Sequence, residues 1–288
     1  MVANSLLDFK KEVRQKLLAM GLEPGEAAAE SEIIVAHVSG LTAAEQTIFD
    51  GSLSEQWQER TAQIIEQRSR HVPLQYVLGH TEFMGMRFHV EPGVFIPRPD
   101  TEVLVEAAIE LVRREQLTSP YFMDIGTGSG AIAIALANYI NDAKVLAVEI
   151  SDVPFRVAQA NAKANGVESR IEFVHGDWRH HVPLDLDIIV SNPPYIPVSL
   201  KETLAPEVEN YEPHLALFGT DEDGLGFYRE MARTTQTAFS KLAGGWLLCE
   251  LGQGQADDCA ALFRAQGWTR ISTKADLSGI KRVLIAHS

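Results

Sequence analysis

The chain has 288 residues, enough for one large domain or two smaller ones, and its 45% hydrophobic and 22% charged residues are ordinary for a soluble globular protein. No stretch approaches the roughly 18 to 20 uninterrupted apolar residues of a membrane span, and two cysteines, Cys249 and Cys259, support neither a disulfide framework nor a metal site. The 25 Lys and Arg against 39 Asp and Glu give a net charge of −14, which disfavours binding to long duplex nucleic acid but leaves room for a local basic patch. These numbers predict a cytoplasmic, metal-free protein that acts on a protein or a small molecule.

Residues 1 to about 75 are predicted to form a small helical domain. Apolar residues recur there at intervals of three and four, for example at Leu6, Phe9, Val13 and Leu17. Glycines and prolines between residues 21 and 51 interrupt the pattern, which indicates several short helices rather than one long helix. The first of these is amphipathic and lacks the continuous apolar region and the cleavage site of a secretory signal.

A β-hairpin is expected next. Residues 81–84 and 87–90 flank a Gly85-Met86 turn, and Pro92-Gly93 then leads into a short strand at 94–96. A helix capped by Asp100 or Thr101 should run from there to about residue 116. We therefore divide the chain into a helical N-terminal domain at 1–78, which we expect to recognise a partner, a hairpin linker at 79–97 and an α/β domain at 98–288.

From residue 121 onward, strands and helices alternate, which is typical of an α/β sheet. The expected strands cover 121–125, 144–150, 171–175, 186–191 and 246–251, with helices near 130–140, 152–165 and 255–266. Residues 269–274 and 282–286 indicate an antiparallel hairpin at the end. A mixed, seven-stranded Rossmann-like sheet that finishes in such a hairpin is expected of methyltransferases rather than of dehydrogenases.

A glycine-rich turn after the first of these strands is a candidate cofactor site. Glycines there let the backbone approach a ligand closely, although a tight turn without a ligand would use them too. A dinucleotide site requires the spacing GxGxxG, whereas here the third glycine comes one residue early and an acid precedes the turn. A carboxylate repels a pyrophosphate but suits the ammonium group of a methionine moiety, which favours S-adenosylmethionine over NAD. The candidate residues are Asp124, Gly126, Thr127, Gly128, Ser129 and Gly130.

Two further strand ends supply candidate contacts to an adenosine group. Glu149 ends the second strand, where a carboxylate can accept both ribose hydroxyls or be an ordinary solvated acid. Asp177 and Trp178 follow the third strand, where an acid can accept from the adenine amino group and an aromatic ring can form an apolar wall. Without their context, Asp177 and Trp178 would be interpreted as an acid in a loop and an aromatic residue of the core. Their position directly after a strand favours a role in binding adenosine.

The segment Asn192-Pro193-Pro194-Tyr195 directly follows the fourth strand and is the candidate catalytic and substrate-binding segment. An amide or exocyclic amine nitrogen has two N–H donors and a delocalised lone pair, which must be localised and aimed to attack a sulfonium methyl group. The Asn192 side-chain oxygen and the Pro193 backbone carbonyl can each accept one N–H, and Tyr195 can stack on the planar group. The two prolines fix the backbone. We expect Asn192 to contact the cofactor as well. No general base is required, because the sulfonium is already activated and the nitrogen becomes acidic only after the methyl group is transferred. A rigid loop without chemistry is the alternative.

These motifs together resemble the HemK/PrmC family of release-factor glutamine methyltransferases over nearly the whole chain. NPPY alone is shared with DNA adenine and ribosomal guanine methyltransferases, but its combination with Ile96-Pro97-Arg98-Pro99 is much more specific. The similar segments also include 73–79, 82–83, 101–102, 124–130, 191–196, 223–225 and 228–229. Glu149 stands where the family often has Asp, and Asp100 where it often has Glu, so the charge is kept at both positions.

The resemblance implies a helical N-terminal domain, a Rossmann-like domain that binds S-adenosylmethionine without a metal, and N5-methylation of the glutamine in the Gly-Gly-Gln motif of class-1 release factors. From the acidic charge balance and the lack of a long apolar stretch, we expect no direct contact with nucleic acid or membrane. Two alternatives stay open. A nucleic-acid amine methyltransferase, acting on adenine N6 or guanine N2, would need a basic groove. A catalytically silent binding module would be expected to have lost the intact NPPY and glycine motifs.

Overall fold

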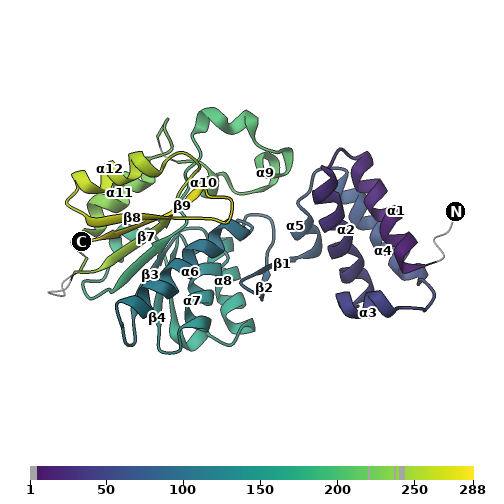
Figure 1. The fold of residues 1–288 in the computed structure, drawn as a ribbon, viewed down its shortest axis with the longest axis horizontal. Coiled ribbons are helices and arrows are strands. Elements are labelled where there is room, and N and C mark those ends of the chain that lie inside the picture. The colour runs from purple at the N-terminus through teal and green to yellow at the C-terminus, as the bar shows by residue number, and fades with distance from the viewer. Residues whose placement is uncertain (1–4, 220, 237, 240–243) are drawn as a thin grey trace. The chain divides into compact units, whose positions relative to one another are not determined.

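The computed structural model describes residues 5–219, 221–236, 238–239 and 244–288. The chain divides into two compact units, residues 1–79 and 80–288 (Figure 1). The first unit is entirely helical, and its helices are α1 (Leu6–Ala19), α2 (Pro24–Ser39), α3 (Ala43–Ile48), α4 (Glu55–Arg68) and α5 (Leu74–Leu78).

Apolar periodicity accounts for the core of the helical unit. The four α1 residues that recur at intervals of three and four, Leu6, Phe9, Val13 and Leu17, are all buried. An ion pair inside the same unit joins α4 to α2, because Arg68 donates to both carboxylate oxygens of Glu30 at 3.0 and 2.8 Å. The prediction of several short helices rather than one long helix is therefore confirmed.

The second unit begins with a two-stranded hairpin, β1 (His80–Phe83) and β2 (Met86–His89). Phe83 and Phe88 are almost fully buried in the core of this unit. The side chain of Asn161 on α8 (Asp152–Ala164) also pairs with the backbone of His89, at 2.8 Å to its N–H and 3.1 Å to its carbonyl. The hairpin is thus anchored to the α/β unit and is part of its fold.

The prediction of a strand at 94–96 is wrong. Val94 and Ile96 are buried, but the segment pairs with no strand among the described residues. The Ile96 N–H instead donates to the carboxylate of Glu212 at 3.4 Å. The apolar run at 94–96 therefore reflects burial and not pairing within a sheet.

The main sheet has seven strands in the order β5-β4-β3-β6-β7-β9-β8. The five strands from β5 to β7 in this order run parallel to one another. Strand β9 pairs antiparallel with both β7 and β8. The strands are β3 (Tyr121–Ile125), β4 (Lys144–Glu149), β5 (Ile171–His175), β6 (Ile188–Ser191), β7 (Trp246–Glu250), β8 (Thr269–Ala275) and β9 (Lys281–His287). This confirms the predicted mixed sheet with its C-terminal hairpin.

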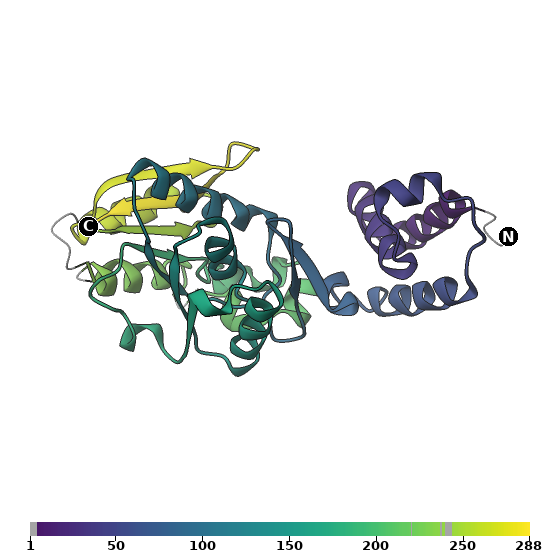
Figure 2. The same ribbon diagram turned by 90° about the horizontal axis from the view of Figure 1, so that it is seen from below.

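Helices cover both faces of the sheet (Figures 1 and 2). On one face of β3, Phe122 belongs to the core that includes α6 (Pro99–Arg114), α7 (Ala131–Tyr139) and α8. Odd-numbered residues of β3, such as Met123, belong to the core with α11 (Gly226–Thr235) and α12 (Ala256–Ala265). This alternation follows from the two-residue period of a strand that is buried on both sides.

Shorter elements complete the chain. They are η1 (Glu168–Arg170), η2 (Trp178–His180), η3 (Val198–Thr203), α9 (Pro206–Tyr211) and α10 (His214–Leu217). None of the helices in the described ranges is long and apolar enough to cross a membrane.

The strand order reverses between β3 and β6. From β3 the chain proceeds outward through β4 and β5, and then returns to place β6 on the other side of β3. Ligands of open α/β sheets bind at the carboxyl ends of the strands at such a reversal. The Ser191 hydroxyl ties these two strand ends together by donating to the Ile125 carbonyl at 2.8 Å.

Candidate active site

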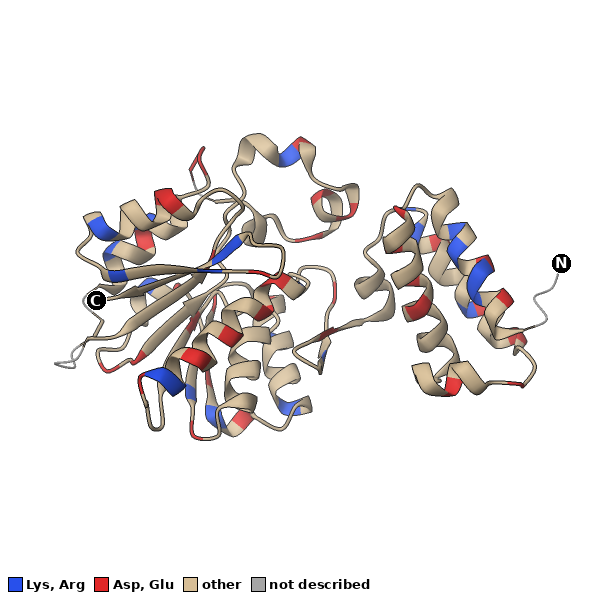
Figure 3. Ribbon diagram, in the orientation of Figure 1, with Lys and Arg blue, Asp and Glu red and all other residues tan. Residues whose placement is uncertain are grey.

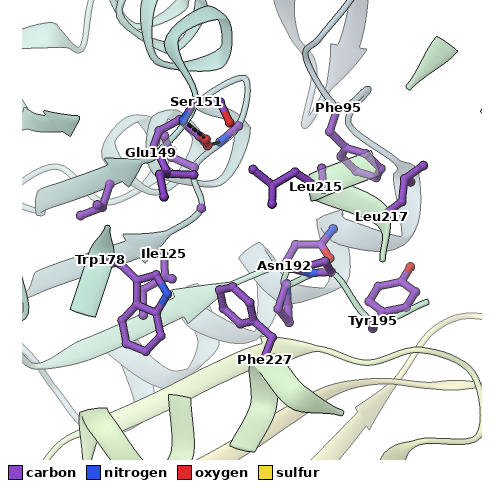
Figure 4. A pocket seen from close by; sticks show the side chains of 18 of the residues that line it. Phe95, Ile125, Glu149, Ser151, Trp178, Asn192, Tyr195, Leu215, Leu217 and Phe227 are labelled. Atoms are coloured by element: carbon purple, nitrogen blue, oxygen red, sulfur yellow. Dashed lines mark hydrogen bonds between the residues drawn. The ribbon is translucent and has the colours of Figure 1, made fainter. Parts of the chain in front are cut away.

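A cavity of about 1060 Å³ opens at the carboxyl ends of β3, β4 and β6. Small-molecule sites commonly occupy roughly 300–1,000 Å³, so this space can hold a cofactor and a substrate group together. Figure 4 shows Glu149 and Trp178 on one side of it, Phe95 and Tyr195 on the other, and Asn192 between them.

The glycine-rich turn after β3 forms part of the cavity wall. Four of the five turn residues, Gly126 to Ser129, line the cavity, and Gly130 does not. The glycines have φ angles of 72°, 59° and 84°, a region that residues with a Cβ rarely adopt. A Cβ on Gly130 would lie 2.9 Å from Ile134 and 3.2 Å from Ala158, so this glycine is required for the approach of α7 and α8.

Asp124 lies behind the turn and is fully buried, outside the residues that line the cavity. Its Oδ2 accepts from the Thr127 hydroxyl at 2.6 Å and from the Ala133 N–H at 3.2 Å. Burial raises the pKa of this carboxyl to about 7, and the neighbouring Glu149 acts in the same direction. Its other oxygen, Oδ1, has no hydrogen-bond partner within the described part of the chain. A contact between Asp124 and the cofactor therefore stays a prediction.

Glu149 reaches the cavity from the end of β4 and is 7% exposed. One carboxylate oxygen accepts from the N–H of Gly128 and the other from the N–H of Ser151, both at 2.9 Å (Figure 4). Each oxygen retains acceptor capacity. The carboxylate is thus held rigidly by the glycine turn, in a position from which it can accept further hydroxyl groups.

Asp177 and Trp178 also line the cavity. The Arg179 side chain donates to both oxygens of Asp177, at 2.9 and 3.0 Å from Nε. These bonds lower the pKa of Asp177 to about 2. An adenine amino group would share the carboxylate with Arg179, so this contact stays a prediction. The Trp178 ring lies 5.8 Å from the Phe227 ring of α11, and together they form an apolar wall.

The orientation of Asn192 is fixed by a hydrogen-bonded chain. Its Nδ2 donates to the Thr101 hydroxyl at 3.0 Å, and that hydroxyl donates to the Glu250 carboxylate at 2.6 Å. An ionised carboxylate only accepts, so the Thr101 proton is directed to Glu250 and a Thr101 lone pair receives the Asn192 amide. The Asn192 carbonyl oxygen is left as an acceptor in the cavity wall, with no hydrogen bond to any described residue.

The remaining residues of the segment are held by their neighbours. Pro193 is buried, and Pro193, Pro194 and Tyr195 all line the cavity. The Tyr195 hydroxyl donates to Glu250 at 3.3 Å, and its backbone carbonyl accepts from Gln255 at 3.0 Å. Burial, reinforced by Glu250, raises the pKa of Tyr195 well above its usual value of 10. The phenol is therefore neutral and serves as a donor.

Several residues in or behind the cavity wall were not predicted from the sequence. Thr101 was expected as a helix cap, but it lies inside α6, whose N-cap is Arg98, and its side chain lines the cavity. Glu250, behind the wall, was not singled out, although an acid at a strand end was the signal used for Glu149. Arg98 forms an ion pair with buried Glu212, which joins the segment before α6 to the segment after β6. The unpredicted apolar lining is Phe95, Leu215, Leu217 and Phe227.

Across the described ranges, no group of three or more His, Cys, Asp or Glu residues is arranged to hold an ion.

The sheet order, the antiparallel C-terminal hairpin and the glycine turn beside an Asn-Pro-Pro-Tyr segment define the Rossmann-like methyltransferases. Comparison with known proteins narrows this class. Two family models match the chain: a PrmC N-terminal domain over residues 11–79 and a methyltransferase small domain over residues 85–205.

Relatives in other organisms align over most of the chain. The release factor glutamine methyltransferase of Geobacter sulfurreducens is 41% identical, over 82% of this chain and 80% of that protein. A 4-amino-L-phenylalanine/4-methylamino-L-phenylalanine methyltransferase of Streptomyces pristinaespiralis is 35% identical, over 94% of this chain and 92% of that protein. The solved N-terminal domain of human METTL16 in complex with SAH is 17% identical, covers 77% of this chain and 82% of that chain, and has a TM-score of 0.52, a similarity of fold. The chain belongs to the release factor glutamine methyltransferase family.

Proposed function

We propose that this protein transfers a methyl group from S-adenosylmethionine to the side-chain amide nitrogen (N5) of the glutamine in the Gly-Gly-Gln motif of class-1 release factors. The observation that carries the proposal is the orientation of Asn192. Because Thr101 receives its N–H, its carbonyl oxygen is available to a donor in the cavity. The backbone carbonyl of Pro193, in the same wall, supplies a second acceptor.

The residues around the glycine turn suit S-adenosylmethionine. Glu149 is a fixed acceptor for ribose hydroxyls, the Trp178–Phe227 wall suits an adenine ring, and the unpaired Asp124 oxygen suits an ammonium group. When bound, the cofactor supplies an electrophilic methyl group on a positively charged sulfur. The chain's own residues then have to position the acceptor nitrogen.

Positioning is the main catalytic effect in this site. A primary amide has two N–H donors on one nitrogen, which matches the two carbonyl acceptors of Asn192 and Pro193. Accepting both fixes the nitrogen and helps to localise its lone pair, while the Tyr195 ring can stack on the amide plane. Alignment of this kind can lower a barrier by several kcal/mol, on the order of 7 at best. The amide proton becomes acidic only after transfer and is lost to water.

The relative that acts on 4-amino-L-phenylalanine motivates one alternative substrate, because an arylamine also presents a planar nitrogen with two N–H donors. A nucleic-acid amine presents the same group. However, basic and acidic residues are interspersed in both units (Figure 3), and the net charge is −14. We propose that the helical unit recognises the release factor and that the protein acts in the cytoplasm.

The proposal is tested with the purified protein, labelled S-adenosylmethionine and a purified class-1 release factor. Peptide mapping should place the label on the glutamine of the Gly-Gly-Gln motif, and a factor with that glutamine replaced by alanine should accept none. Parallel reactions contain 4-amino-L-phenylalanine or an adenine-containing oligonucleotide. Faster transfer to either of these than to the release factor would overturn the proposal.

A further inference from the structure

Glu250 is a buried carboxylate that the sequence did not single out. It ends β7 and is 1% exposed. Its two carboxylate oxygens accept from hydroxyls on two different segments: Oε2 from Thr101 on α6 at 2.6 Å, and Oε1 from Tyr195 after β6 at 3.3 Å. The backbone carbonyl of Glu250 accepts from Tyr228 at 2.8 Å. One residue thus joins α6, β7, α11 and the NPPY segment.

Burying a carboxylate is costly unless hydrogen bonds and charges compensate. Around Glu250 the compensating groups are the hydroxyls of Thr101 and Tyr195 and the guanidinium of Arg282 on β9. Arg282 also forms ion pairs with Asp100 at 2.8 Å and with Asp276 at 3.0 Å. Asp100 opposes ionisation, and the other titratable neighbours, Cys249 and Tyr228, are buried and neutral. A core position that needed only packing would be better filled by an apolar residue.

We propose that Glu250 is a positioning residue, which orients Asn192 through Thr101 and holds Tyr195 directly, so that both face the acceptor nitrogen of the substrate. This inference rests on the proposed function. Glu250 does not line the cavity, so its effect on the reaction passes through these two side chains.

The protonation state of Glu250 decides which way the chain of hydrogen bonds runs. As a carboxylate it accepts from Thr101, and the Thr101 lone pair then accepts from Asn192. Once protonated, Glu250 can donate to Thr101, whose own proton is then free to turn toward Asn192. That arrangement favours a flipped amide with its N–H groups in the cavity. Burial raises the pKa of Glu250 to about 7, so the productive orientation should be gained as the pH rises through neutrality.

The test measures single-turnover methyl transfer to a release factor between about pH 6 and pH 8, on either side of the Glu250 pKa. Glu250→Gln keeps the shape but does not titrate in this range, and Thr101→Val keeps the shape but breaks the link to Asn192. Thr101→Ser restores the hydroxyl. Glu172→Gln, which removes an exposed acid on β5, is the matched control. Binding of S-adenosylhomocysteine is measured for each protein.

We expect the rate of the unmodified protein to rise with pH, and the rise to be lost in Glu250→Gln and Thr101→Val. The rate of Thr101→Val at the higher pH should fall roughly tenfold or more, and Thr101→Ser should recover most of it. S-adenosylhomocysteine affinity should stay within about twofold. Unchanged rates and an unchanged pH profile in Thr101→Val would overturn the proposal, as would an equal loss of cofactor affinity. If the unmodified protein transfers nothing to the release factor, it is the proposed function that fails.

Discussion

At the scale of single residues, the site depends on carboxylates held in different ways at the carboxyl edge of one sheet. Glu149 is fixed by backbone N–H groups, Asp177 by the guanidinium of Arg179, and Glu250 by hydroxyls. Asp124 is the least satisfied of the four, since one of its oxygens is buried without a partner among the described residues. Because their environments differ, we expect replacement of the individual acids to have different effects on stability and on cofactor affinity.

Asp124 should make the protein less stable as the pH rises. Its pKa is about 7 in the folded protein against 3.8 for an ordinary Asp, so between these values the folded state binds the extra proton. The stabilisation that Asp124 gives the folded state is fully present below about pH 4 and is lost as the pH rises to about 7. Above about pH 7 the free energy of unfolding no longer changes because of Asp124. The loss is at most about 4 kcal/mol.

Urea denaturation of the unmodified protein and of Asp124→Asn, at several pH values in this window, measures that contribution. Groups that do not interact with Asp124 titrate equally in both proteins, so the difference between the two free energies of unfolding reports Asp124 together with its interaction with Glu149. A difference that does not vary with pH would contradict the account.

Glu149 should contribute directly to cofactor affinity. Glu149→Ala removes the acceptor for ribose hydroxyls and also leaves the N–H groups of Gly128 and Ser151 without their partner. We expect S-adenosylhomocysteine to bind more weakly by roughly 1–3 kcal/mol, measured by calorimetry. Glu172→Ala, which removes an exposed acid on the neighbouring β5, should bind normally. Equal affinities of the two variants would refute the assignment.

At the scale of elements, the NPPY segment is positioned by the chain around Gly224. A Cβ at Gly224 would lie 2.3 Å from the backbone oxygen of Tyr195 and 3.1 Å from Pro197, and its φ is 73°. Gly254 has a similar φ of 87° but no atom within 4 Å of such a Cβ. An alanine at either position would therefore strain the backbone, but only at Gly224 would its Cβ also clash with neighbouring atoms.

Gly224→Ala should displace the NPPY segment and lower methyl transfer, roughly tenfold or more, whereas Gly254→Ala should lose some stability and little activity. Turnover and thermal midpoints of both variants check this. Loss of activity in Gly254→Ala as large as in Gly224→Ala would mean that strain, and not contact with Tyr195, is responsible.

The elements that form the sheet could be predicted from the sequence, because strands buried on both faces have short apolar runs and glycines mark their ends. The short elements between β6 and α11 could not. The position of η3, α9 and α10 depends on contacts such as the pairing of Ile196 with Phe218 and the ion pair of Arg98 with Glu212. The apolar run at 94–96 was misread as a strand, because two of its residues are buried without any pairing to a sheet.

The same limit applies to the site. Motifs near strand ends predicted the cavity wall, but the bond from Thr101 to Glu250 joins residues 149 positions apart. No local pattern signals such a pair.

At the scale of the whole molecule, the helical unit and the α/β unit have separate cores and different expected roles. The hairpin residues Phe83 and Phe88 belong to the core of the α/β unit, so a deletion should end at residue 79 and keep the hairpin. The truncated protein, residues 80–288, retains every residue of the cavity.

We expect the truncated protein to bind S-adenosylhomocysteine with nearly unchanged affinity, while methylation of the full release factor falls steeply. A cooperative thermal transition and calorimetry establish that it is folded and binds the cofactor. Full-length rates of methylation by the truncated protein would show that the helical unit does not recognise this partner.

The most direct test of the account is the rate of methyl transfer from S-adenosylmethionine to the release-factor glutamine by Asn192→Ala, measured at saturating substrate. Removal of the acceptor should lower turnover by roughly 10²-fold or more and leave S-adenosylhomocysteine affinity nearly unchanged. Asn192→Asp, which keeps an acceptor at similar geometry, should retain part of the activity. A normal turnover number in Asn192→Ala would contradict the central claim that this carbonyl oxygen holds the acceptor nitrogen.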